Sequence, residues 1–250
     1  MIFSNLQNII FNKDSVPIIS DELNIFLKKI KYDDYNKKLR RIITDYYGNP
    51  YKINPLSIEK DNFPSFSLYY QDCTLFVINS LSLSVSENYS EYIENYIDNF
   101  YYSKNKISYV SRIHFTEDRL LSNPNFSLYY PDILKPLEQK IICVLNKKSN
   151  GNKLLDIDFS KKIEIKILSS ENLNMLNDFF KKNKGISGIA FVRKKNIENG
   201  HLISHEGFIF DSTLYHASKD TGSVCQTNDI PDYIKRCNFD GIIFFKYGFY

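Results

Sequence analysis

The hydrophobic pattern changes along the chain, and this change limits the fold more than any other feature of the sequence. Over the first hundred residues apolar side chains recur at the spacing of an amphipathic helix. In the last third, short runs such as Ile163-Glu164-Ile165-Lys166-Ile167 alternate as strands do. Helices first and an antiparallel sheet last predict an α+β fold.

The expected elements follow from these patterns. Gly48-Asn49-Pro50 should end the second helical run, and the prolines at 124, 131 and 136 suggest an irregular segment. We expect helices near residues 23–30, 39–46, 73–83, 90–100, 170–180 and 230–235, and strands near 163–167, 188–192, 202–210 and 241–245. We expect one catalytic domain over residues 1–250, with an N-terminal helical part (1–60), an inserted cleft segment (103–136) and a sheet part (160–250).

Composition excludes several classes of protein. The hydrophobic fraction of 43% and the charged fraction of 24% are typical of globular domains. The 32 basic and 29 acidic residues are scattered, and the net charge of +3 gives no basis for nucleic-acid binding. No apolar stretch approaches the roughly 20 residues that span a bilayer. We therefore expect no nucleic-acid partner and no membrane span. We also expect a monomer.

The four cysteines, Cys73, Cys143, Cys225 and Cys237, form no C-x-x-C pair and no disulfide-dense pattern. The spacing predicts no zinc site, and we expect no metal and no cofactor. A disulfide between Cys225 and Cys237 would need an oxidising compartment, so this pairing stays open. The N-terminus shows no signal peptide.

Cys73 has the sequence setting of a nucleophile. It follows Asp72 and opens an apolar helical run, and a helix start stabilises a thiolate through unpaired N–H groups. Cys143 lies instead within the apolar run 141–145 and should be buried. Taken alone, Cys73 could equally be a small core residue at a helix start.

Two histidines strengthen the catalytic interpretation. His205 lies in an expected strand, and His216 follows after a turn around Asp211-Ser212-Thr213. Two adjacent antiparallel strands would bring the imidazoles side by side. A single histidine is more often a partly buried structural residue, so only the combination with Cys73 is informative.

These motifs resemble the NlpC/P60 superfamily of cell-wall cysteine peptidases and amidases. The resemblance rests on Asp72-Cys73-Thr74-Leu75-Phe76-Val77, Ser204-His205-Glu206-Gly207-Phe208 and Tyr215-His216-Ala217-Ser218. It implies a papain-like core, in which the helix carrying the nucleophile packs on an antiparallel sheet, with N-terminal helices and an inserted helical or loop segment.

One branch, the DUF1460 family described as N-acetylmuramoyl-L-alanine amidase-like, is more similar still. Its Y-x-x-R-x-H-F motif is matched by Tyr109 to Phe115, and the similarity extends over roughly residues 45–246. The resemblance implies hydrolysis of an amide in peptidoglycan stem peptides, with Cys73 as nucleophile, His205 as base and His216 orienting that base. It favours the periplasm or cell envelope.

Residues around the expected site suggest substrate contacts. A planar guanidinium suits a carboxylate, so Arg112 is a candidate anchor, with His114 beside it in sequence. Tyr69 or Tyr70 could assist backbone N–H groups in binding an oxyanion. Loop fixing is the alternative for Arg112 and His114.

Other functions stay open at this point. Within the superfamily, a γ-D-glutamyl endopeptidase is the alternative cleavage. An exported effector acting on host proteins or lipids would use the same chemistry on another substrate. A non-catalytic binding module could share the fold, although the presence of all three triad residue types argues against it.

Overall fold

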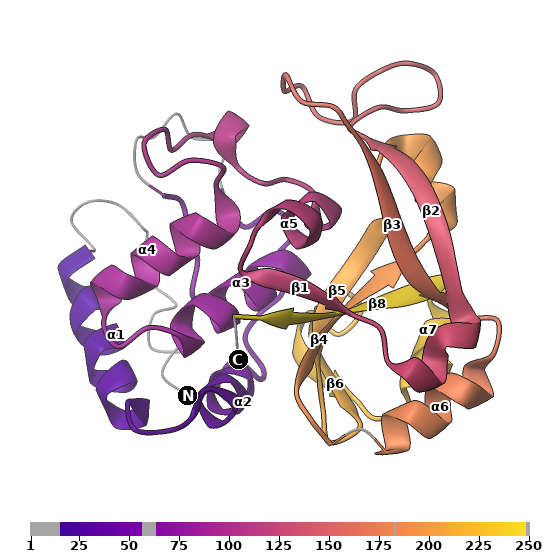
Figure 1. Ribbon diagram of the computed structural model, residues 1–250. Coiled ribbons are helices and arrows are strands. Elements are labelled where there is room, and N and C mark those ends of the chain that lie inside the picture. The colour runs from indigo at the N-terminus through magenta and orange to yellow at the C-terminus, as the bar shows by residue number, and fades with distance from the viewer. Residues whose placement is uncertain (1–15, 57–63, 183, 249–250) are drawn as a thin grey trace. The chain divides into compact units, whose positions relative to one another are not determined.

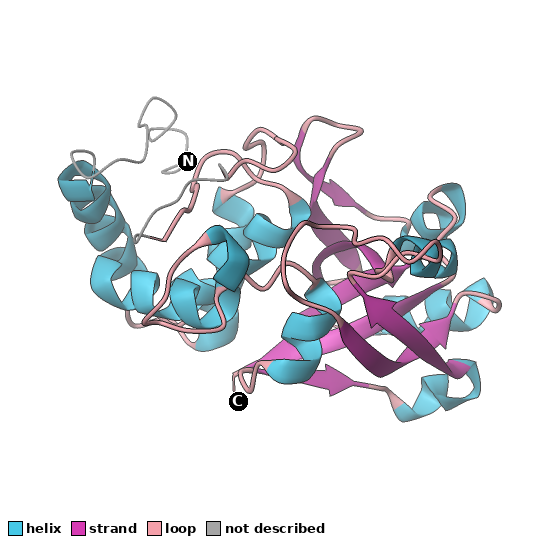
Figure 2. Ribbon diagram, turned by 90° about the horizontal axis from the view of Figure 1, so that it is seen from above, coloured by secondary structure: helices cyan, strands magenta, loops and turns pink. Residues whose placement is uncertain are grey.

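A computed structural model describes residues 16–56, 64–182 and 184–248, which form two compact units. The helical unit comprises Met1–Ile113 and Tyr215–Gln226, and the sheet unit comprises His114–Leu214 and Thr227–Tyr250. Figure 1 labels their elements, and Figure 2 colours helices and strands separately. The expected α+β class, with helices and an antiparallel sheet, is confirmed. A single catalytic domain stays a prediction.

The helical unit begins with the helices that the periodicity predicts. Its elements are α1 (Val16–Ile30), α2 (Tyr35–Asp45), α3 (Cys73–Ser84), α4 (Tyr89–Phe100) and the short 3-10 helix η2 (Tyr109–Ser111). Asp34 and Asn88 cap α2 and α4 by accepting backbone N–H groups with their side chains. Gly48, at φ +84°, ends the helical segment that includes α2, as expected. Part of the expected helical region, residues 1–15 and 57–60, lies outside the described residues.

Helix α3 is buried on every side from Leu75 to Ser84, and its polar residues Asn79, Ser80, Ser82 and Ser84 are buried with the apolar ones. Aromatic rings surround it within the helical unit: Phe76 meets the edge of Tyr46, with ring centroids 5.9 Å apart. Phe66 makes similar edge contacts with Tyr92 and Tyr96 of α4. Such contacts fix the position of the α3 start, where Cys73 lies.

Antiparallel pairing organises the sheet unit. Within it the strand order is β2-β3-β8-β4-β5, and β1 pairs with β8. Two further strands, β6 (Thr213–Ser218) and β7 (Ser223–Thr227), continue the chain across the unit boundaries. The bounds of the others are β1 Phe126–Tyr129, β2 Glu138–Leu145, β3 Lys161–Ser169, β4 Ser187–Val192, β5 Ile203–Phe210 and β8 Gly241–Tyr247.

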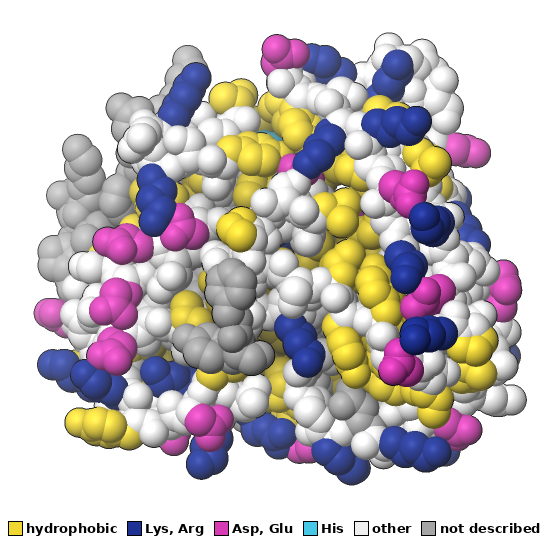
Figure 3. Space-filling view, viewed as in Figure 1, with side chains coloured by type: hydrophobic (Ala, Val, Ile, Leu, Met, Phe, Trp, Pro, Cys, Tyr) yellow, Lys and Arg dark blue, Asp and Glu magenta, His cyan; other side chains and the backbone are white. Residues whose placement is uncertain are grey.

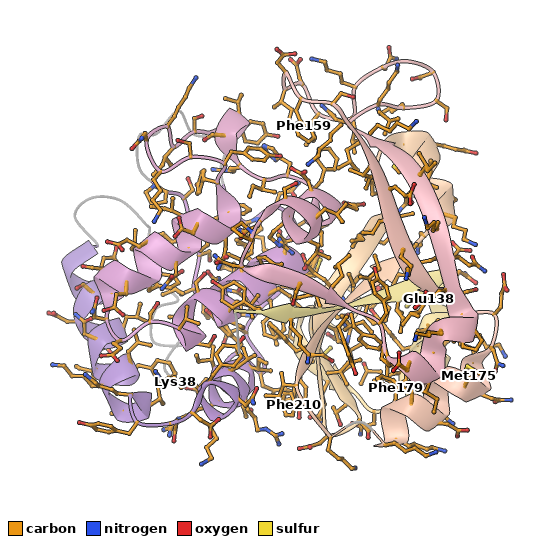
Figure 4. The ribbon with its side chains drawn as sticks, in the orientation of Figure 1. Lys38, Glu138, Phe159, Met175, Phe179 and Phe210 are labelled. Atoms are coloured by element: carbon orange, nitrogen blue, oxygen red, sulfur yellow. The ribbon has the colours of Figure 1, made fainter. Side chains whose placement is uncertain are left out.

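Among its described residues, the sheet unit contains five short helices. They are α5 (Thr116–Ser122), η3 (Asp132–Leu137), α6 (Leu173–Lys182), η4 (Lys194–Asn199) and α7 (Ile230–Arg236). Of these, η3, α6 and α7 contribute side chains to the apolar core of the unit. The core contains Leu176 and Phe180 of α6 with Phe191 and Phe244 of the central strands. Met175 and Phe179, labelled in Figure 4, pack beside it. Gly188 leaves room for Phe245 on the neighbouring strand, since a Cβ there would lie 2.1 Å from that ring.

Residues 103–136 differ from the expectation of an irregular insertion. The part from His114 onward belongs to the sheet unit and supplies α5 and β1, and β1 pairs with β8 over four residues. The sheet likewise begins before residue 160, because β2 precedes the long connection to β3. Phe159 of that connection, labelled in Figure 4, stacks on Phe115, with ring centroids 5.7 Å apart.

The surface agrees with the scattered charge pattern of the sequence. Basic and acidic side chains are interspersed on the face shown in Figure 3. Most ion pairs are exposed, as between Lys140 and Glu164 on adjacent strands, and contribute little to stability. Among the described residues, no helix is both long and apolar enough to cross a membrane.

Candidate active site

Cys73 is the first residue of α3, and its surroundings follow from the local sequence. Asp72 has extended backbone angles and accepts the Leu75 N–H with its carboxylate at 2.8 Å, which makes it the N-cap. Cys73 is half-buried at this helix start. Unpaired N–H groups at such a position stabilise a thiolate, as well as an oxyanion formed beside it.

The segment from Asn49 to Lys52 connects the Cys73 region with the β6–β7 hairpin inside the helical unit. On one side, the Gln71 N–H bonds to the Pro50 carbonyl, and Lys52 N–H bonds to the Gln71 carbonyl. On the other, Tyr51 N–H bonds to the Gly222 carbonyl at 2.8 Å. The segment that leads into α3 and the hairpin that carries His216 therefore both form backbone hydrogen bonds with residues 48–52.

Tyr51 is a further candidate site residue, which the sequence did not reveal. Burial raises the pKa of its phenol to about 12, and the nearby charges of Cys73 and Asp72 add to this shift. The side chain is an O–H donor at neutral pH, and the raised pKa keeps it protonated further into the alkaline range, close to the candidate nucleophile. The sequence signal near Tyr51 was Gly48-Asn49-Pro50, and it predicted only the end of a helix.

His216 lies on β6 and only 1% of its surface is exposed. Burial lowers the pKa of the imidazole to about 4, although Asp220 in the following turn acts in the opposite direction. The ring is therefore neutral at pH 7. Its Nε2 atom lies 3.5 Å from the Cys225 sulfur on β7.

His205 lies on β5 in the sheet unit and is half-buried. Its ring stacks on Phe191 of β4, with centroids 5.8 Å apart, and is tilted against Tyr233 of α7. The expected turn after β5 is confirmed: Asp211 and Ser212 both have positive φ, as in a two-residue hairpin turn. The aromatic contacts hold the imidazole in one orientation relative to its strand.

Side chains of helix α5 contact the chain just before and just after His205. The Glu117 carboxylate accepts the backbone N–H groups of Leu202 and Ile203, each at 2.5 Å. Arg119 forms an ion pair with Glu206, and both side chains are completely buried. Desolvation raises the pKa of Glu117, whereas the two backbone donors oppose this shift. Glu117 and Arg119 belong to the segment 103–136, which we expected to line a cleft, and their side chains contact β5 inside the sheet unit.

Arg112 lies in the helical unit with 6% of its surface exposed. Its guanidinium lies over the rings of Phe100 and Tyr109, at 6.0 and 5.5 Å from their centroids. Burial raises the pKa of Tyr101, and the neighbouring Arg112 charge opposes that shift. These contacts favour a role in fixing the loop, and anchoring of a substrate carboxylate stays a prediction.

The other expected substrate contacts are more accessible. Tyr70 is 40% exposed and Tyr69 is half-buried, and their rings meet edge to face at 4.9 Å. Lys52 lies over the Tyr70 ring, 5.1 Å from its centroid. His114 is half-buried at the start of the sheet unit. The pairing of Tyr51 with Gln71 places Tyr51, Tyr69 and Tyr70 around the approach to α3.

Cys73 and His216 thus belong to the helical unit, whereas His205 belongs to the sheet unit. Convergence of all three side chains stays a prediction. The four cysteines, all within the described residues, carry thiols, and Cys143 is buried as expected. The described residues contain no group of three or more His, Cys, Asp or Glu side chains placed to hold a metal ion.

Comparison with solved structures identifies similar folds. A Legionella pneumophila str. Philadelphia 1 protein, LPG0564, described under family DUF1460, has a TM-score of 0.73 at 17% identity, over 93% of this chain and 95% of that one. An N-acetylmuramoyl-L-alanine amidase from Bacteroides uniformis ATCC 8492 has a TM-score of 0.63 at 15% identity, over 86% of this chain and 99% of that one. At these identities the likeness shows a shared fold. A search of curated proteins finds no match.

The family comparison is more specific than the structural one. The model of the AmiA-like family, described as N-acetylmuramoyl-L-alanine amidase-like, matches residues 41–242. That range includes the Cys73 helix start, the α5 contacts and both histidine strands. The chain belongs to the AmiA-like family, DUF1460.

Proposed function

We propose that this protein is a cysteine amidase of the NlpC/P60 superfamily, with a papain-like core, that cuts an amide bond in peptidoglycan stem peptides. The observation that carries the proposal is Cys73 at the capped start of a buried helix, in a chain of an amidase-like family. Hydrolase activity of this kind needs an activated nucleophile, and Cys73 has the local setting for one.

The proposed reaction has two stages. His205 takes the thiol proton from Cys73, and the thiolate attacks the amide carbonyl to form a tetrahedral intermediate. As the C–N bond breaks, His205 returns the proton to the leaving amine. Water then hydrolyses the acyl-enzyme and regenerates the thiol. His216 orients His205, as an Asp or Asn does in other triads. Direct proton transfer requires the Cys73 sulfur and a His205 nitrogen to meet at about 3 Å.

Stabilisation of the oxyanion falls to donors around Cys73. Backbone N–H groups at the α3 start point outward from the helix and are suited to a developing negative charge. Tyr51 supports them because its phenol, with a pKa raised to about 12, keeps its proton and can donate a hydrogen bond. We infer that Tyr51 has the role first considered for Tyr69 or Tyr70, which then contact the substrate.

The proposed substrate is the amide between the lactyl group of N-acetylmuramic acid and L-alanine. The family description supports this bond, as does the name of the Bacteroides uniformis protein, at low identity. A γ-D-glutamyl endopeptidase cleavage is the second candidate within the same chemistry. An exported effector on host substrates and a non-catalytic binding module are the remaining alternatives.

Digestion of purified sacculi distinguishes these candidates. We expect the wild-type protein to release peptides that begin with L-alanine, identified by mass spectrometry, and Cys73→Ala to release none. Fragments that begin at the third stem residue would instead identify the endopeptidase. Cys143→Ala is a matched control, because Cys143 is buried in the sheet unit and should not affect the reaction. Absence of any product from wild type would contradict a cell-wall substrate.

Alkylation by iodoacetamide tests the nucleophile without a substrate. Cys73 should react fastest, because burial raises the pKa of Cys143 to about 11 and also raises that of Cys225. His205→Ala should slow alkylation of Cys73 near neutral pH if His205 is the base. An unchanged rate and pH profile in this variant would remove His205 from the proposal.

Arg112 can be assigned by comparing turnover with alkylation. If Arg112 anchors a substrate carboxylate, Arg112→Ala should raise the activation free energy of turnover by roughly 1.5 to 3 kcal/mol. This is the typical contribution of a hydrogen bond to a charged group. Alkylation of Cys73 would then be nearly unchanged. Equal loss of turnover and alkylation would show that Arg112 supports the fold of the helical unit. Its burial against the rings of Phe100 and Tyr109 favours this role.

A further inference from the structure

The β6–β7 hairpin brings a second cysteine to the orienting histidine. His216 on β6 and Cys225 on β7 lie within residues 215–226 of the helical unit, on neighbouring strands. The His216 Nε2 atom is 3.5 Å from the Cys225 sulfur, within hydrogen-bonding distance for sulfur. His216 is buried and Cys225 is half-buried. Their contact is therefore shielded from most competing water.

A neutral imidazole carries one N–H donor and one lone-pair acceptor. Which nitrogen holds the proton depends on the partner of each. Burial keeps His216 neutral at pH 7, with a pKa lowered to about 4. The contact with Cys225 can therefore decide the tautomer of His216.

Two hydroxyl groups around the sulfur indicate the direction of this hydrogen bond. The side chains of Ser218 and Thr221 act on the Cys225 thiol: burial raises its pKa, and these two hydroxyl groups oppose that shift. Thr221 donates its own hydroxyl hydrogen to the Ser223 carbonyl at 3.2 Å, so its oxygen can accept the thiol hydrogen. With the thiol hydrogen engaged in this way, the sulfur would be able to accept a hydrogen bond from the His216 side, 3.5 Å away.

We propose that the Cys225 sulfur accepts the Nε2–H group of His216 and holds the imidazole in the Nε2-protonated tautomer. The lone pair is then on Nδ1, which makes His216 an acceptor on that side. An acceptor is the form that an orienting residue needs to hold an N–H group of His205. Cys225 is thus a positioning residue, and its catalytic consequence rests on the proposed function.

The tautomer can be measured directly, without any substrate. Full-length protein with ¹⁵N-labelled histidine is examined by long-range ¹H–¹⁵N NMR at pH 7, and His216→Gln identifies the His216 signals by their absence. We expect a proton on Nε2 in wild type, mixed tautomers in Cys225→Ala, and the wild-type form in Cys225→Ser, since a hydroxyl oxygen also accepts. Cys237→Ala, at another half-buried cysteine, should leave the spectrum unchanged.

A proton on Nδ1 in wild type would overturn the inference, as would an unchanged tautomer in Cys225→Ala with an otherwise native amide spectrum. In the sacculus assay we expect Cys225→Ala to lower kcat about 2- to 10-fold with KM unchanged, the effect of one neutral hydrogen bond. Cys225→Ser should recover most of this loss. An inactive wild-type protein with the expected tautomer would contradict the proposed function and leave the Cys225 contact established.

Discussion

The two units hold their candidate catalytic residues by different physical means. In the helical unit, neutral groups hold the segment before Cys73, apart from the Asp72 carboxylate that caps α3. The Asn79 amide of α3 donates to the Ser67 carbonyl at 2.8 Å and to the Gln71 side chain at 3.1 Å, and it accepts the Tyr92 hydroxyl at 2.9 Å. All these partners are buried. The network positions the residues just before Cys73 without using a charge.

In the sheet unit, charged groups position the strand that carries His205. Arg119 and Glu206 form a fully buried ion pair, and the Thr116 hydroxyl donates to the same carboxylate at 3.0 Å. Nearby, the buried Asp118 accepts from Lys161 at 2.6 Å. Buried charges lose their hydration, so this arrangement depends on every partner being present. The difference predicts that the sheet unit is more sensitive to substitution and the helical unit less so.

The largest expected effect comes from breaking the buried ion pair. Arg119→Met leaves the Glu206 carboxylate buried without its partner, and we expect a loss of about 3 to 5 kcal/mol in the free energy of unfolding. Replacing Glu206 with Leu as well should recover much of this loss, because two apolar side chains need no hydration. Urea denaturation of the single and double variants measures both values. A single variant as stable as wild type would show that the pair does not stabilise β5.

Acid pH should affect the two units in opposite directions. The pKa of His216 is lowered from 6.5 to about 4 in the folded protein, so the unfolded chain binds the proton more tightly. Stability should therefore fall as pH decreases from 6.5 to 4, by about 3 kcal/mol at about 1.4 kcal/mol per pH unit. The raised pKa of Glu117 has the opposite sign, and its stabilising effect is lost as pH rises through that pKa.

Unfolding measured between pH 4 and 7 separates these contributions. Compared with wild type, His216→Gln should flatten the acid decrease in stability. Glu117→Gln should steepen it, because the compensating proton uptake is gone. Identical pH profiles for wild type and His216→Gln would show that the imidazole is not held neutral in the fold.

The smallest effect is expected in the neutral network. Asn79→Ala leaves the Tyr92 hydroxyl and the Gln71 side chain without one partner each, at a cost of about 1 to 3 kcal/mol. This cost should not change between pH 5 and 8, since no member titrates there. Ser80→Ala is the matched control on the same helix: Ser80 is buried, and its hydroxyl has no hydrogen-bond partner among the described residues. Equal losses in both variants would indicate a packing effect instead.

Sequence patterns predicted the elements whose signals are local. The α3 start was readable because its cap, Asp72, adjoins Cys73 and bonds three residues ahead. The strand at residues 163–167 alternates so regularly that its inward face was evident. Strand β1 gave no such signal, because four residues become a strand only by pairing with β8, more than a hundred residues away.

The same distinction between local and long-range signals applies to the residues of the candidate site. Cys73, His205 and His216 were nominated by residue type and by motif order, and the family match covers all three. Tyr51 and Cys225 were not, because their relevance depends on backbone pairing of residues 48–51 with 222–224 and on a contact between two strands. Glu117 and Arg119 carried no signal of their contacts, since their partners lie 85 or more residues away along the chain.

The sequence by itself therefore determined the fold class, the capped helix that begins at Cys73 and the strands of both histidines, because periodicity and capping act over a few residues. Only the tertiary structure decided which polar groups are buried. Burial lowers the pKa of His216, raises that of Tyr51 and makes the loss of one partner alone from the Arg119–Glu206 pair costly. Desolvation depends on everything packed around a group, and residues distant in the chain supply most of that packing.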